Sequence, residues 1–165
     1  LLAVARLEVS PSWLGHPQGS TLIAISSPPY EHWQPAACSQ VTRLDGPCLF
    51  TYRGQVYAVG RYQPELSGPF CYQGSILARK RTSLFRVGEA GLEHLSDLPS
   101  AGDTAYAGAV ARGDDLYVCY YTSDIRKDYA WLVGLFSPSS IRMARVSLPA
   151  LESKTTLPAG GRSDL

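Results

Sequence analysis

The sequence lacks any stretch in which apolar residues recur at helical spacing over several turns, so we expect helices to be scarce. It also lacks a long hydrophobic run. The longest, residues 129–136, is far shorter than the roughly 20 residues that a membrane-spanning helix requires. These two absences argue against a helical bundle and against a membrane-spanning helix.

Neither sign of charge is in excess. The 15 lysine and arginine residues nearly balance the 14 aspartate and glutamate residues, which leaves a net charge of +1. Such a chain has no broad field that would recruit nucleic acid or an anionic membrane surface, and we expect neither partner. The one basic cluster, 79–81, is short and fits a solvated strand end.

Metal-ligand spacing is absent as well. The cysteines form no CxxC pair and no cysteine–histidine pattern, and the histidines, His16, His32 and His94, lie among proline, glycine and polar residues. We therefore expect no metal ion and no cofactor. Cys48 and Cys119 fall within apolar strand patterns, which predicts buried free thiols, although the 4 cysteines would also permit two disulfides. The cysteines alone leave the cellular compartment open.

The chain is instead rich in turn residues and tyrosine, with 15 glycines, 12 prolines and 10 tyrosines. Short apolar or alternating runs between turn signals predict an all-β fold. The expected strands are 1–9, 21–26, 48–52, 55–60, 75–77, 83–87, 92–95, 105–111, 116–121, 129–136 and 141–148. Arg53-Gly54 suits a tight turn that joins two of them into a hairpin.

The stretch 98–121 contains the clearest hairpin and a notable pair of polar side chains. A loop of turn-forming residues leads into strand 105–111, and the chain returns through the aromatic strand 116–121. Asp103 and Tyr106 lie where the loop enters the strand. A β-scaffold can present chemistry at such a position.

Sandwich, barrel and propeller folds all have short strands at this spacing. Hairpins that recur at roughly 50 residues favour a propeller, of which this chain would supply about three blades of antiparallel strands. A complete small β-sandwich is an alternative, but residue 1 already lies within a strand pattern and is not methionine. We therefore expect residues 1–150 to be the C-terminal portion of a propeller domain and 151–165 to be a flexible tail.

Several short motifs occur in a characteristic order. Residues 26–33, SSPPYEHW, keep the serine and tryptophan of an Asp-box turn, in which the tryptophan (here Trp33) packs between strands of a blade. The other motifs are ARLE at 5–8, RLDGPCLF at 43–50, YAVGR at 57–61, RTSL at 81–84, LPSAGDTAYAG at 98–108, LYVCYYTS at 116–123 and IRMARVSL at 141–148. Together they resemble the C-terminal half of bacterial sialidase-like (Asp-box) β-propellers, a group that is largely uncharacterised.

The resemblance implies a set of site residues. Sialidases hold the substrate carboxylate with arginines, since guanidinium groups offer paired donors, and they use a tyrosine nucleophile whose proton passes to a nearby base. By their positions in the matching motifs, Tyr106 is the implied nucleophile, with Glu8 and Asp103 as carboxylate partners. The implied substrate-binding residues are Arg6, Arg61 and Arg81.

Each of these residues also has a purely structural interpretation. Tyr106 can pack at a strand start with its hydroxyl on a backbone carbonyl, and Asp103 can close an Asx-turn. An arginine that ends an apolar run, as Arg6 and Arg61 do, commonly extends from the sheet into solvent.

We therefore expect a carbohydrate-active, glycosidase-like protein in which this chain carries part of a central sugar-binding pocket. It would be a glycoside hydrolase if the full-length protein is catalytic. The alternative is a non-catalytic propeller that binds glycan or protein through the same face. Open sheet edges predict association with missing N-terminal blades or with a second copy. The resemblance alone implies a bacterial secreted or periplasmic protein.

Overall fold

The computed structural model describes residues 1–8, 19–39, 43–66, 74–88 and 91–155. Within these ranges the chain forms antiparallel strands and two short helices, so the expected all-β fold is confirmed. The strands make three sheets, which differs from the two layers of a simple sandwich.

The sheets follow one another along the chain. The first, the β1–β3 sheet, consists of β1 (Leu2–Glu8), β2 (Gly19–Ile25) and β3 (Gln34–Ser39). The second, the β4–β7 sheet, consists of β4 (Asp45–Tyr52), β5 (Gln55–Tyr62), β6 (Arg81–Gly88) and β7 (Gly91–Asp97). The third, the β8–β10 sheet, consists of β8 (Thr104–Arg112), β9 (Asp115–Ser123) and β10 (Ser139–Ser147). The helices are α1 (Trp131–Leu135) and α2 (Leu148–Thr155).

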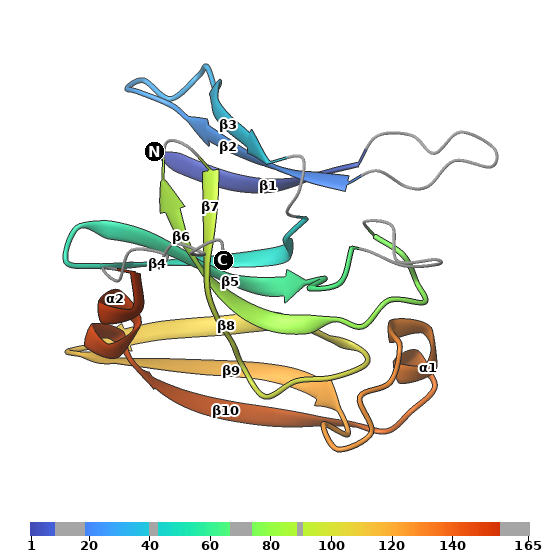
Figure 1. Ribbon diagram of the computed structural model, residues 1–165. Coiled ribbons are helices and arrows are strands. Elements are labelled where there is room, and N and C mark those ends of the chain that lie inside the picture. Colours follow the sequence, from blue (N-terminus) through green and yellow to red (C-terminus); the bar gives the residue numbers. More distant parts are fainter. Residues whose placement is uncertain (9–18, 40–42, 67–73, 89–90, 156–165) are drawn as a thin grey trace, which may run out of the picture.

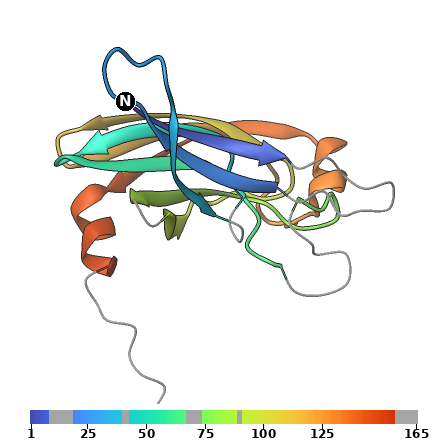
Figure 2. The same cartoon turned by 90° about the horizontal axis from the view of Figure 1, so that it is seen from above.

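The three sheets are stacked, with the β4–β7 sheet in the middle (Figure 1). In each sheet the spatial order of the strands follows their order in the sequence, so each is an up-and-down meander. The first strand of the middle sheet, β4, contacts the first strands of both neighbours, β1 and β8. Helices α2 and α1 lie beside opposite ends of the strands of the β8–β10 sheet (Figures 1 and 2).

Each face of the middle sheet is the wall of a separate core, because successive side chains of a strand point to opposite faces. One face, with Tyr57 and Leu84, packs against Leu116 and Val118 of the β8–β10 sheet and against α2. The other face packs against the β1–β3 sheet, and its buried members are Leu44, Ala58, Phe85 and Val87, with Ile23 from β2. Apolar residues on both faces explain why β5 and β6 have almost continuous apolar sequences.

Both hairpins predicted from the sequence are present. Strands β4 and β5 turn at Arg53-Gly54, where both residues have the positive φ angles (49° and 78°) that a tight hairpin turn requires. Strands β8 and β9 pair as expected, although a bulge interrupts the ladder between Ala105 and Gly108.

Two expected strands are wrong. Residues 75–77 form no strand, and the run 129–136 contains the helix α1 instead. The amides of Trp131 and Leu132 donate to the carbonyls of Ala78 and Ile76, so the start of α1 is hydrogen-bonded to residues 76–78. Periodicity alone does not distinguish a strand from a helix in so short an apolar run. Strand β3, in contrast, was not expected, because its sequence begins with Gln-Pro-Ala-Ala.

Three further expectations require correction. Residues 151–155, which were expected to belong to a flexible tail, form the second half of α2, and Leu151 is buried. The remainder of the expected tail, 156–165, lies outside the described residues. Trp33 is 47% exposed and does not pack inside a sheet. Cys48 is half-buried but Cys119 is exposed, since alternate residues of β9 face away from the core.

Candidate functional site

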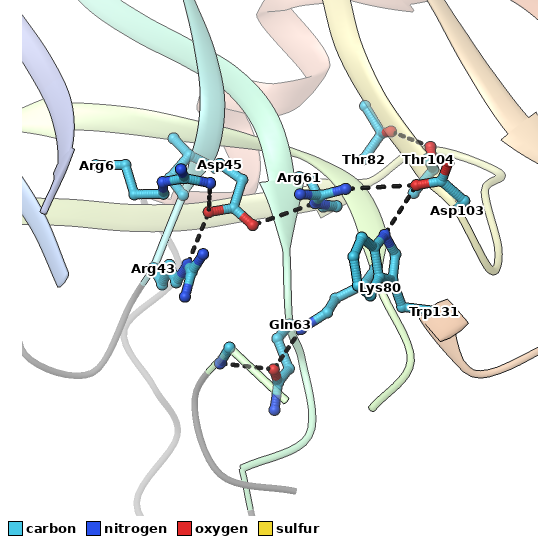
Figure 3. Close-up of polar contacts among 12 residues, drawn as sticks. Arg6, Arg43, Asp45, Arg61, Gln63, Lys80, Thr82, Asp103, Thr104 and Trp131 are labelled. Atoms are coloured by element: carbon cyan, nitrogen blue, oxygen red, sulfur yellow. Dashed lines mark hydrogen bonds and ion pairs between the residues drawn. The ribbon is translucent and has the colours of Figure 1, made fainter. Parts of the chain in front are cut away.

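The most unusual polar cluster surrounds Asp45 (Figure 3). This carboxylate accepts hydrogen bonds from three arginines: from Arg43 Nε at 2.7 Å, from Arg61 Nε at 3.2 Å and from Arg6 Nη1 at 3.3 Å. The side chains of Asp45, Arg43 and Arg61 are at most 15% exposed, whereas that of Arg6 is 40% exposed. Three guanidinium groups therefore converge on one nearly buried carboxylate.

The first strands of the sheets position this cluster. Asp45 is the first residue of β4 and lies opposite Arg61 in the β4–β5 ladder. Arg6 extends from β1, which contacts β4. A bulge follows Asp45, and Gly46 within it has a φ of 58°, a conformation that favours glycine. The bulge ends regular pairing beside the carboxylate, as bulges near functional sites often do.

A second carboxylate, Asp103, extends the cluster toward α1. Arg61 Nη1 lies 3.4 Å from Asp103 Oδ1, which also accepts the indole N–H of Trp131 at 2.8 Å. The Arg61 guanidinium lies over the Trp131 ring at 5.2 Å from its centroid, within the range of a cation–π contact. The other Asp103 oxygen accepts the hydroxyl of Tyr121 at 3.0 Å.

The close approach of α1 to the loop before β8 depends on glycine. A Cβ on Gly134 would lie 2.1 Å from the backbone nitrogen of Asp103, a distance that no side chain permits. Gly134 is the buried residue of α1. Its missing side chain therefore allows Trp131 to reach Asp103 (Figure 3).

The electrostatics of the two carboxylates are set by burial and by the arginines. Burial is the largest influence on Asp45 and opposes its ionisation, but the hydrogen bond from Arg43 and the charges of Arg43, Arg61 and Arg6 together outweigh it. The pKa of Asp45 is therefore lowered from its ordinary value of 3.8. Burial, followed by the charge and hydrogen bond of Asp103, raises the pKa of Tyr121 to about 12. At neutral pH Tyr121 is a neutral phenol that donates to a carboxylate.

Tyr106 lies beside this cluster in a strained conformation. It occupies the β8 bulge with a φ of 48°, which is rare for a non-glycine residue within a strand, and its side chain is 79% exposed. Its ring is tilted by 30° against that of Tyr121, with 6.2 Å between the centroids, and approaches Gly46. No hydrogen bond of its hydroxyl is found within the described residues. The bulge therefore directs Tyr106 away from the core.

The structure brings together three of the predicted site residues, Arg6, Arg61 and Asp103, and places Tyr106 at their margin. Arg81 lies elsewhere: its Nη1 pairs with Asp128 at 2.8 Å, and it lines a separate cavity of about 440 Å³. Glu8 ends β1, and its side chain is outside the part of the chain that the structure describes.

Sequence reasoning missed the residues that hold the cluster together. Asp45 is its centre, yet a single aspartate before glycine resembles an ordinary turn signal. Tyr121 and Trp131 reach Asp103 from β9 and α1, and only the fold shows that they do. One available signal was the pair Arg43 and Asp45 within the motif 43–50.

The arrangement suits recognition of an anionic polar ligand. Arg6, Arg43 and Arg61 outnumber Asp45 and Asp103 by one charge, and Tyr106 adds an exposed aromatic surface. Among the described residues, no group of histidine, cysteine and carboxylate side chains could hold a metal ion, and neither helix has the length and apolar character needed to cross a membrane. A scan against protein-family models, a search of the curated proteins and a search of the solved structures each found no significant match.

Proposed function

We propose that this chain forms part of a sialidase-like β-propeller and contributes one wall of a central pocket that binds an acidic sugar. The pocket is glycosidase-like. The full-length protein would hydrolyse a glycoside if sheets outside this chain supply the other catalytic groups that the tyrosines of this wall need. The observation that carries the proposal is the convergence of Arg6, Arg43 and Arg61 on Asp45, next to Asp103 and two tyrosines.

The sheet arrangement supports the propeller. Three consecutive antiparallel meanders are stacked, and the first strands of the second and third, β4 and β8, are neighbours that both begin beside the site, as the inner strands of consecutive blades would. The site residues lie on or beside these strands. In a closed ring they would face the central axis, where a propeller ligand binds. Propellers need at least four blades, so the proposal includes further sheets outside this chain.

The arginine cluster supports an acidic ligand. Guanidinium groups bind carboxylates through paired, permanently charged donors. Asp45 fixes the three side chains before any ligand arrives, so that less conformational entropy is lost on binding. Arg6 is the most exposed of the three and offers the surface that a ligand carboxylate would meet first.

The tyrosines support a covalent mechanism in two ways. Tyr106 remains the candidate nucleophile because its strained, exposed ring is presented to the ligand side. Tyr121 is the tyrosine whose hydroxyl already donates to a carboxylate, Asp103, which could accept the phenolic proton during attack. We assign Asp103 the role of base, and the test below separates the two tyrosines.

The second candidate function is a non-catalytic propeller that binds a glycan or a protein through the same face. One observation favours it. Asp103 accepts hydrogen bonds from Arg61, Trp131 and Tyr121 at once, so donors of the chain itself already occupy both of its oxygens, as they would at a wall that only binds.

Hydrolysis of an activated aryl glycoside of an acidic sugar tests the proposal in the full-length protein. Tyr106→Phe and Tyr121→Phe each remove one oxygen and keep the ring. The variant that lacks the nucleophile should lose several powers of ten in turnover, with little change in melting temperature. If the parent protein hydrolyses no glycoside but binds the sugar, the binding function replaces the catalytic one.

A further inference from the structure

The Asp45 carboxylate occupies the point where the three guanidinium groups of the site meet (Figure 3). Its Oδ1 accepts hydrogen bonds from Arg43 and Arg6, and its Oδ2 accepts one from Arg61. Guanidinium donors directed at both oxygens of one carboxylate are also what an acidic ligand requires. The side chain of Asp45 is 11% exposed. A carboxylate of the chain itself therefore fills the position where the arginines would hold the carboxylate of a ligand.

The strands also contribute to the convergence of the arginines. Arg61 lies within β5, where it pairs with Asp45 on one side and with Thr82 on the other. Its guanidinium is held a second time by Asp103 at 3.4 Å and by the Trp131 ring. Arg6 lies within the regular β1–β2 ladder. The fold would therefore keep these guanidinium groups near one another if Asp45 lost its charge.

Arg6 is the place where a ligand and Asp45 would meet. Its hydrogen bond to Asp45 is 3.3 Å long, against 2.7 Å for that of Arg43, and its side chain is 40% exposed, against 11% for Arg43. A contact of an exposed guanidinium is the easiest to exchange. A ligand carboxylate that reaches Arg6 from solvent also approaches the negative charge of Asp45, which repels it.

We propose that Asp45 is an internal competitor of the acidic ligand: it occupies the carboxylate position of the arginine cluster and so weakens binding of the ligand. The ligand engages Arg6, whereas Arg43 and Arg61 remain with Asp45. The arginines keep the pKa of Asp45 below its ordinary value, so the competitor is charged at neutral pH. The inference rests on the proposed acidic-sugar pocket and adds a restraint on the affinity of that same site.

Calorimetric titration of the full-length protein with N-acetylneuraminic acid tests the competition. Asp45→Asn keeps the shape and one acceptor oxygen of the side chain and removes its charge. This variant should bind the sugar at least roughly tenfold more tightly than the parent, with a steeper dependence on salt. If Asp45 only positions the arginines, the variant should bind equally or more weakly, and either result would overturn the proposal.

Asp115→Asn is the matched control. Asp115 pairs with Arg112 at the hairpin end of β9, away from the site, and its carboxylate lies 2.7 Å from the exposed Arg145. The control removes one negative charge from the same molecule without changing the arginine cluster. It should leave the affinity for the sugar unchanged. A gain equal to that of Asp45→Asn would show that net charge alone is responsible and would count against an internal competitor.

A second readout needs no sugar. Asp45→Ala removes three heavy atoms, which have the composition of a formate ion. If the arginines still converge, sodium formate should raise the melting temperature of this variant above its value in equimolar sodium chloride. The parent and Asp115→Ala should melt alike in the two salts. The same response in formate and chloride for Asp45→Ala would mean that no carboxylate position exists without Asp45, which contradicts the proposal.

The inference and the proposed function fail separately. Binding of the sugar by the parent, without a gain in Asp45→Asn, retains the acidic-sugar pocket and overturns the competitor. Binding by Asp45→Asn alone supports the competitor and counts against sugar binding as a function of the parent. If neither protein binds the sugar, the sugar pocket is wrong, and the formate experiment decides whether Asp45 occupies a carboxylate position.

Discussion

At the scale of single residues, Arg61 is the link between the two carboxylates of the site. Its guanidinium contacts Asp45 through Nε and Asp103 through Nη1, and its face covers Trp131. The sequence left two interpretations of Arg61 open, a substrate contact and an arginine that extends from the sheet into solvent; its side chain is only 15% exposed. Arg61 is therefore a structural residue as well as a candidate ligand contact.

We expect Arg61→Ala to lower the free energy of unfolding by roughly 3 kcal/mol, because it leaves two nearly buried carboxylates without a shared cation. Urea denaturation measures this value. Arg126→Ala is the matched control, since Arg126 is 85% exposed and its one ion pair among the described residues is with the nearby Asp124. The control should leave the urea midpoint unchanged. Equal midpoints for both variants would show that the Arg61 contacts add nothing to stability.

Asp45 should make stability depend on pH. Its pKa is lower in the folded protein than the ordinary 3.8. A carboxyl group of this kind stabilises the fold fully above its unfolded pKa, and this contribution is lost as the pH falls through the folded value. The unfolding free energy should therefore fall steeply below about pH 4.

Asp45→Asn isolates this contribution. Asp97, Asp115 and Asp124 also have lowered pKa values and should keep part of the acid sensitivity in the variant. Urea midpoints measured from neutral pH down to pH values below 3.8 should give a shallower acid slope for Asp45→Asn than for the parent. Parallel slopes would mean that the arginine cluster does not hold Asp45 in its ionised form.

At the scale of elements, helix α2 closes one core and is tied to the β4–β5 hairpin. Leu148 and Leu151 are buried in the core between the middle sheet and the β8–β10 sheet. The hydroxyl of Tyr57 donates to Glu152 at 3.2 Å, and Arg53 lies 3.5 Å from the same carboxylate. The helix is thus part of the packed structure.

Leu151→Ala should cost about 2–5 kcal/mol of unfolding free energy, because it removes a buried side chain from a packed core. Ala150→Ser, at the exposed neighbouring position of α2, is the control and should change stability by no more than about 0.5 kcal/mol. Thermal or urea unfolding of both variants gives the comparison. If Leu151→Ala lowers the unfolding free energy as little as the control does, α2 does not stabilise the core and behaves like the flexible tail that the sequence predicted.

The elements that could be predicted are those in which the apolar pattern and the turn residues of the same segment indicate the same structure. The hairpin at Arg53-Gly54 combines apolar alternation with a turn that needs positive φ angles, and it forms as expected. Strand β3 could not be predicted, because Pro35 and its alanines have low strand propensity, and an edge strand tolerates them. Helix α1 depends on contact between Gly134 and the loop before β8, which no local pattern shows.

The candidate site could be predicted only in part for a similar reason. Motif positions pointed to Arg6, Arg61 and Asp103, and these residues do meet. Asp45, which joins Arg6 to Arg61, is far from Arg6 in the sequence, and its role appears only when β1 and β4 become neighbours. The pairing of Asp103 with Tyr121 rather than with Tyr106 depends on the β8 bulge, which turns Tyr106 outward.

At the scale of the whole molecule, the site draws one charged residue from the first strand, or the residue just before it, of each of the three stacked sheets. Arg6, Asp45 and Asp103 come from, or directly precede, β1, β4 and β8, one for each sheet. In the proposed propeller, further sheets would close the ring and complete the pocket.

The most direct test of the account is calorimetric titration of the full-length protein with an acidic monosaccharide such as N-acetylneuraminic acid, with glucose as the neutral control. We predict binding of the acidic sugar alone, weakening as salt is added because arginine charges contribute to it. Arg6→Gln, which changes the most exposed arginine of the cluster, should weaken binding at least roughly tenfold. Equal binding of both sugars, or no binding of either, would contradict the proposed pocket.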